Sequence, residues 1–147
     1  MAQFQGSRGF AAAIDTALAA NENTNGLGDL PEWNLGDLYA APDAPELKSD
    51  LERAAKDAAA FEAEWKGKLA EEAGKGADGR LGEAVAAYET LEELMGRIVS
   101  YSGLLYAGDT SDPVRAKLYG DVQEKLTDAS AHLIFFTLEM NNIEDKV

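Results

Sequence analysis

Apolar residues recur every three or four positions through three long stretches of this chain, and glycine, proline or aspartate separates each stretch from the next. This spacing matches the about 3.6-residue turn of an α-helix and collects apolar side chains on one face. Strict alternation of apolar and polar residues, which is typical of strands, does not occur. The pattern predicts an all-α fold: an antiparallel array of three long helices near 45–69, 81–107 and 112–143, preceded by an extended N-terminal segment.

Each predicted helix carries one apolar stripe, which we interpret as its core-facing side. The stripe of the first helix consists of Leu47, Leu51, Ala54, Ala58, Phe61, Trp65 and Leu69. The second consists of Leu81, Val85, Tyr88, Leu91, Met95, Ile98 and Leu105. The third consists of Leu118, Val122, Leu126, Ala129, Leu133, Phe136, Met140 and Ile143.

Residues that favour helix ends stand where these stretches begin and end. Pro45 suits a first helical turn, where its missing N–H group has no intrahelical acceptor. Gly108 ends the second stretch, and the carboxylate of Asp112, before Pro113, is predicted to cap the third helix. Residues 74–79 match the GxGxxG dinucleotide fingerprint, but a helix instead of a strand precedes them, so we interpret 73–80 as a loop.

The whole chain divides into two parts. Residues 1–30 contain a Gly/Asn-rich stretch, and we expect a flexible arm. Residues 31–147 form the predicted helical domain, which opens with a short apolar segment expected to lie across the core.

Asp15 interrupts the apolar stretch 10–20, and no stretch reaches the about 20 apolar residues of a membrane span, so the expected compartment is the cytoplasm.

Residue counts restrict the chemistry of the chain. It has no cysteine and a single histidine, His132, which excludes thiolate metal sites and the HExxH zinc motif. Asp128 lies four residues before His132, but Ala129 occupies the position where a di-iron bundle carries glutamate. We therefore expect a hydrogen-bonded or solvent-facing histidine, and we assign no catalytic, metal-binding or substrate-binding residue.

The balance of charge restricts the partners. The chain holds 13 basic and 27 acidic residues, a formal net charge of -14. Such a surface repels phosphate backbones and anionic lipid headgroups, so nucleic acid and membrane surfaces are not expected partners. The acidic pairs at 71–72 and 92–93 are interpreted as solvated helix faces.

The end of the third predicted helix is apolar on nearly all sides. The residues concerned are Leu133, Ile134, Phe135, Phe136 and Leu138. A helix that is apolar all round is normally buried all round, and two partner helices do not cover it completely. We expect a longer protein to supply the missing neighbours, and we expect the isolated chain to self-associate through 133–138.

Three segments follow one another in order along 31–143. Residues 31–39 read Pro-Glu-Trp-Asn-Leu-Gly-Asp-Leu-Tyr, and residues 101–113 read Tyr-Ser-Gly-Leu-Leu-Tyr-Ala-Gly-Asp-Thr-Ser-Asp-Pro. Residues 121–126, Asp-Val-Gln-Glu-Lys-Leu, lead into 132–136, His-Leu-Ile-Phe-Phe. Together these segments resemble the N-terminal region of the oligoendopeptidase F family of zinc metallopeptidases, which are similar to thimet oligopeptidase.

The resemblance implies a longer, mostly helical enzyme that hydrolyses internal bonds of short peptides. It implies a later catalytic domain with HExxH and a downstream glutamate, so the zinc of the parent has its ligands outside this chain and this fragment holds none. The implied partners are that C-terminal catalytic domain and the oligopeptide substrates, whose channel the N-terminal helices wall.

Two alternatives to this interpretation stay open. The first is a stand-alone helical protein-interaction module without enzymatic activity. The second is a small helical enzyme that uses only carboxylates and tyrosines, which is disfavoured because the sequence indicates no convergent polar cluster.

Overall fold

The computed structural model describes residues 33–143, and every regular element in this range is helical. The elements are α2 (Pro45–Trp65), α3 (Leu69–Gly74), the 3-10 turn η1 (Gly76–Asp78), α4 (Leu81–Gly108), α5 (Pro113–Ala131) and α6 (Ile134–Asn141). Because no strand occurs between residues 33 and 143, the all-α prediction is confirmed for this range. The predicted arm, 1–30, lies outside the described residues.

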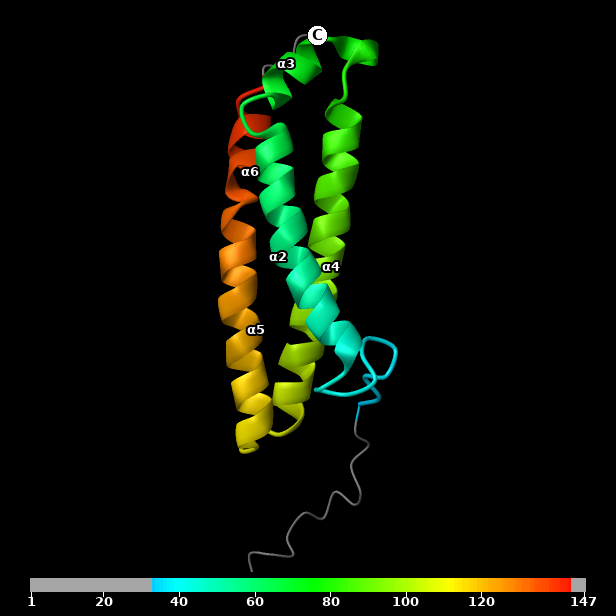
Figure 1. Cartoon of the computed structure of the whole chain (residues 1–147), viewed down its shortest axis with the longest axis vertical. Helices are drawn as coiled ribbons and strands as arrows, with labels where there is room; N and C mark the ends of the chain where they lie inside the picture. The colour runs from blue at the N-terminus through cyan, green and yellow to red at the C-terminus, as the bar shows by residue number, and fades with distance from the viewer. Residues whose placement is uncertain (1–32, 144–147) are drawn as a thin grey trace, which may run out of the picture. The chain divides into compact units, whose positions relative to one another are not determined.

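Three long helices lie side by side and pack against one another in all pairs. In Figure 1, α4 runs opposite to α2, and α5 runs opposite to α4. Helix α6 continues the direction of α5 beside the C-terminal end of α2, while α3 lies across the same end and contacts both α4 and α6. The short elements α3 and α6 therefore cover one end of the bundle.

The core runs along the centre of this bundle. Every residue of the three predicted stripes is either buried in it or packed against it. Phe61 lies among three other aromatic rings, with centroids 5.6 Å from Phe135, 5.6 Å from Phe136 and 6.1 Å from Tyr88. The rings of Tyr88 and Phe136 stack with centroids 4.3 Å apart, which joins α4 to α6. Burial of such side chains is the main stabilising contribution, about 1.5–3 kcal/mol for each.

The first helix is shorter than the sequence predicts. It ends at Trp65 instead of near residue 69, and a separate helix, α3, begins at Leu69. Gly67 has a φ of 79°, in the left-handed region that ends helices and favours glycine. Its backbone N–H donates a 2.7 Å hydrogen bond to Oε1 of Glu139 on α6. The break therefore lets Leu69 stay buried while the chain turns across the end of the bundle.

The third predicted helix, 112–143, is interrupted at residues 132–133. There the N–H groups of His132 and Leu133 donate to carbonyl groups three residues back, at 3.2 and 2.9 Å, so the helix tightens into a 3-10 turn. In the turns before the break, the hydroxyl of Thr127 donates to the carbonyl of Gln123, and that of Ser130 to the carbonyl of Thr127. Such side-chain bonds to backbone carbonyls bend helices.

The structure corrects the expectation that the apolar residues of 133–138 are left without neighbours in this chain. Leu133, Phe135 and Phe136 are buried, and only Ile134 and Leu138 are exposed, at 60% and 59%. In an uninterrupted helix Leu133 and Phe135 would point about 200° apart. Here both are buried, Phe135 packs against Phe61 of α2, and α3 contacts α6. The expectation counted only the other two long helices as neighbours, whereas a separate helix over 69–74 also contacts α6.

The segment ahead of α2 also differs in part from expectation. Leu35, Leu38 and Tyr39 pack on the core as predicted, but Trp33 is 65% exposed. The carboxylate of Asp112 caps α5 as expected, accepting from the N–H of Val114 at 2.7 Å.

Candidate functional site

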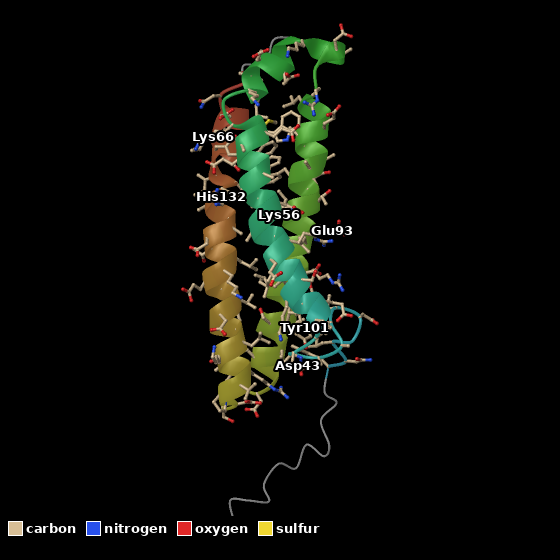
Figure 2. All side chains as sticks on the ribbon, in the orientation of Figure 1. Asp43, Lys56, Lys66, Glu93, Tyr101 and His132 are labelled. Atoms are coloured by element: carbon tan, nitrogen blue, oxygen red, sulfur yellow. The ribbon has the colours of Figure 1, made fainter. Side chains whose placement is uncertain are left out.

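His132 is the first side chain to consider, because it is the only imidazole in the chain. Its Nδ1 lies 2.5 Å from Oε2 of Glu62 on α2, and Oε1 of Glu62 accepts a 2.6 Å bond from Nζ of Lys66. Figure 2 shows His132 and Lys66 on the same side of the bundle. The bond from Lys66, and after it the bond to His132, lowers the pKa of the Glu62 carboxyl. The expected hydrogen-bonded histidine is thus found, and its partner is on another helix.

No three metal-ligating side chains gather within residues 33–143 in a way that would hold an ion. His132 bonds to Glu62 and not to Asp128, its neighbour one turn earlier. The glycine-rich residues matching GxGxxG form the end of α3 and the turn η1, between helices.

One polar group joins the opening segment to α2 and α4. Oδ2 of Asp50 accepts a 2.8 Å hydrogen bond from the hydroxyl of Tyr39. Arg53 and Arg97 both reach Asp50, at 3.2 and 3.7 Å. The guanidinium of Arg97 also donates to the carbonyl of Leu38 and lies 4.4 Å from the centre of the Tyr39 ring. These contacts hold the opening segment on the bundle.

Two tyrosine rings lie at the centre of this group. Tyr39 and Tyr101 meet edge to face, with centroids 5.2 Å apart. Burial, and then the bond to Asp50, raises the pKa of Tyr39 far above its ordinary value, and burial raises the pKa of Tyr101. Both phenols therefore hold their protons to a higher pH than an exposed tyrosine does, and the hydroxyl of Tyr39 stays a donor to Asp50.

The turn between α4 and α5 is held by a second set of contacts. The rings of Tyr106 and Tyr119 stack in parallel with centroids 5.2 Å apart. Arg115 donates to the carbonyl of Leu105 at 3.2 Å, and its Nε lies 3.4 Å from the carboxylate of Asp112. The end of α4 and the start of α5 are thereby fixed relative to each other.

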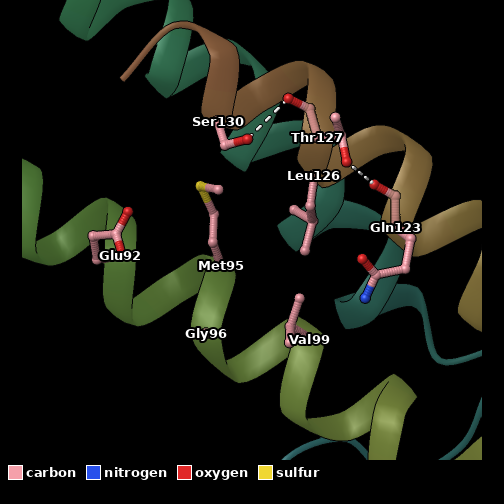
Figure 3. A pocket seen from close by; sticks show the side chains of 8 residues that line it. All are labelled: Glu92, Met95, Gly96, Val99, Gln123, Leu126, Thr127 and Ser130. Carbon is pink, nitrogen blue, oxygen red and sulfur yellow. Dashed lines mark hydrogen bonds between the residues drawn. The ribbon is translucent and has the colours of Figure 1, made fainter. Parts of the chain in front are cut away.

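An open groove of about 350 Å³ lies between α4 and α5. Figure 3 shows side chains from both helices along it, with α2 behind them. Its lining consists of Glu92, Met95, Gly96, Val99, Gln123, Leu126, Thr127 and Ser130. Met95 and Leu126 are buried and form its floor, whereas Val99 is 39% exposed. This groove joins apolar and polar side chains of two helices, and we take it as the candidate functional site.

Sequence reasoning did not identify this groove. Met95 and Leu126 were assigned to core stripes, but the small residues beside those stripes were not singled out. One signal was present: Gly96 interrupts a long helical pattern, and a glycine kept within a helix can have a packing or functional reason. The facing positions, Thr127 and Ser130, are small as well.

Comparison with protein-family models, with curated proteins and with solved structures gave no match to this chain. None of the helices between residues 33 and 143 combines the length and the apolar character needed to cross a membrane.

Proposed function

We propose that this chain is the N-terminal, non-catalytic helical domain of a cytoplasmic zinc-dependent oligoendopeptidase of the oligoendopeptidase F type. In this proposal the catalytic domain follows on the same polypeptide and carries HExxH. The helices described above help to wall the channel that admits oligopeptides. The zinc and its ligands belong to that later domain, and the present helices have a structural role.

The observation that carries the proposal is the contact between Tyr39 and Tyr101. These residues belong to two of the segments that resemble the family, and they lie 62 positions apart in the sequence. Their rings meet at 5.2 Å, and Arg97 ties the same opening segment to α4. Each of these segments alone is a weak indication of the family. A direct contact between two of them supports interpreting them together. The antiparallel arrangement of the long helices also agrees with a helical peptidase domain.

The test compares the chain 1–147 with the complete polypeptide encoded by its gene. Zinc content and cleavage of a quenched fluorescent oligopeptide are measured for both. We expect one zinc per complete polypeptide with cleavage at internal bonds, and neither in the chain alone, because zinc sites need three or four protein ligands. A complete polypeptide without HExxH, or submicromolar stoichiometric zinc binding by 1–147, contradicts the proposal.

The second candidate is a stand-alone helical protein-interaction module. The observation in its favour is the α4–α5 groove, whose apolar floor is open to a partner. The gene sequence separates the two candidates, since a module of this kind does not require HExxH downstream.

A further inference from the structure

The groove between α4 and α5 runs along residues 92–99 and 123–130 and has small residues on both walls. A Cβ atom added at Gly96 would meet nothing within 4 Å, so this part of the α4 surface is open. Thr127 and Ser130 on the opposite wall are small, and their hydroxyls already bond to carbonyls of their own helix. Met95, Val99 and Leu126 offer apolar contacts. Small residues beside an apolar floor allow a further helix, in addition to α2, to pack against both α4 and α5.

The rim of the groove is acidic. Glu92 lines it, Glu89 lies one turn earlier on α4, and Glu124 follows the lining residue Gln123 on α5. All three are exposed, and none forms an ion pair with another residue of the range 33–143. By contrast, Arg97 on the other flank of α4 is engaged with Asp50. Lys125, next to Glu124, is also exposed and without an ion pair in this range, so the charge of the groove lining itself is that of Glu92, within a chain of net charge -14.

We propose that this groove binds an amphipathic helix whose apolar stripe is flanked by lysine or arginine. The stripe covers Met95, Val99 and Leu126, and the basic flanks pair with the carboxylates of Glu89, Glu92 and Glu124. Helix-in-groove binding of this kind uses apolar anchors at intervals of about three and four residues. Opposite charge at the rim selects the partner and speeds association. This inference stands independently of the peptidase proposal, since it uses only the geometry and charge of α4 and α5.

The acidic rim argues against a second copy of the chain as the occupant. A copy would bring its own net charge of -14 to a surface that is already negative, and repulsion would oppose close packing. A basic helix instead gains from the same field. The partner is therefore identified by its charge and periodicity.

The probe is an 18-residue peptide of leucine and lysine, about 27 Å long as a helix, with leucine at helical spacing. Binding to the chain 1–147 is followed by fluorescence anisotropy, and helix formation by circular dichroism. One control peptide has the same composition in a scrambled order, which removes the stripe. The other has glutamate in place of lysine, which reverses the flanks.

Protein variants locate the binding site. Gly96→Leu fills the groove, while Gly82→Leu adds the same side chain at another open glycine of α4, outside the groove. Thr127→Leu fills the groove from α5 and serves if Gly96→Leu disturbs folding, which the circular dichroism spectrum and urea midpoint report. Glu92→Gln removes a rim charge, and Glu52→Gln removes an exposed carboxylate of α2 as its match.

We expect the leucine–lysine peptide to bind and become helical on wild type and on Gly82→Leu. Gly96→Leu or Thr127→Leu should weaken binding about tenfold or more, because the apolar stripe loses its burial. Glu92→Gln should weaken binding by about two- to fivefold, more than Glu52→Gln, as expected for one partly exposed ion pair.

Three results would overturn the proposal. The first is equal affinity for the ordered and scrambled peptides, which means attraction by net charge only. The second is equal affinity of wild type and the groove-filling variants, or of the lysine and glutamate peptides. The third is that wild type sediments as a dimer and Gly96→Leu sediments as a monomer. This result would mean that a second copy of the chain occupies the groove.

Discussion

The hydroxyl of Tyr39 donates a 2.8 Å hydrogen bond to Oδ2 of Asp50, and this bond fastens the segment ahead of the bundle to α2. The ring of the same tyrosine is buried against Tyr101 of α4 and beneath the guanidinium of Arg97. One side chain thus connects the opening segment to both helices. Its removal is the most direct way to test how firmly that segment is held.

Tyr39→Phe keeps the ring and removes the bond to Asp50. We expect the free energy of unfolding in urea to fall by about 0.5–1.5 kcal/mol, the usual net value of one such bond. Tyr119→Phe removes a hydroxyl from a ring that stacks on Tyr106 and is the matched control. Equal losses in the two variants would show that the bond to Asp50 adds nothing.

The same tyrosine predicts a loss of stability in alkali. Burial and the bond to Asp50 raise the pKa of folded Tyr39 above the value of about 10 in the unfolded chain. Above that pH the unfolded chain loses the phenolic proton first, so its stabilising effect is complete below about pH 10 and declines as the pH rises. Urea unfolding of wild type and Tyr39→Phe between about pH 9 and 11 measures this, and parallel pH curves would contradict it.

Phe136 and Ile134 differ in burial although they are two residues apart. Phe136 is 7% exposed and stacks on Tyr88, while Ile134 is 60% exposed. Phe136→Ala should lower the free energy of unfolding by about 3–5 kcal/mol, and Ile134→Ala by no more than about 0.5 kcal/mol. Similar losses in the two variants, measured by urea denaturation, would show that α6 is oriented differently.

Glu62 should make the α2–α6 end of the bundle sensitive to acid. The bonds from Lys66 and to His132 lower the pKa of the folded Glu62 carboxyl. A lowered pKa stabilises the folded state above the unfolded value of about 4.3 and ceases to do so as the pH falls through the folded value. Glu62→Gln should therefore lose less stability than wild type between about pH 5 and 3.

Control variants separate the two partners of Glu62. Lys66→Gln should reproduce most of the change in pH dependence, because its bond is the larger cause, and His132→Gln should reproduce less. If wild type and Glu62→Gln lose stability in parallel on acidification, the contacts of Glu62 have no energetic consequence.

Self-association through 133–138 remains a prediction, now restricted to Ile134 and Leu138. These two exposed side chains lie one helical turn apart on α6. Each forgoes part of the about 1.5–3 kcal/mol that complete burial contributes, which favours contact with another copy, and salt screens the opposing charge. Sedimentation of wild type and of Ile134→Glu with Leu138→Glu, at low and moderate salt, measures it. A monomeric wild type at high micromolar concentration in both salts would contradict the prediction.

The apolar period of the sequence was sufficient to predict the class of fold and the residues of the core. Positions such as Leu47, Ile98 and Val122 are buried because a helix brings every third or fourth residue to the same face. The cap at Asp112 was predictable for a similar reason, since the carboxylate bonds to N–H groups only two and three residues away. Local geometry decides features of this kind.

The candidate groove and the course of the chain at the end of the bundle depend on residues far apart in sequence. Gly67 bonds to Glu139 across 72 positions, and His132 bonds to Glu62 across 70. No proline or glycine marks the break at residues 132–133. The groove likewise exists only because Gly96 and Thr127 face each other from different helices. Thus the sequence by itself determined which residues form helices and which face the core, through interactions within a turn. The tertiary structure alone decided where the last helix bends and which apolar residues stay exposed, because packing between distant segments outweighs local preference there.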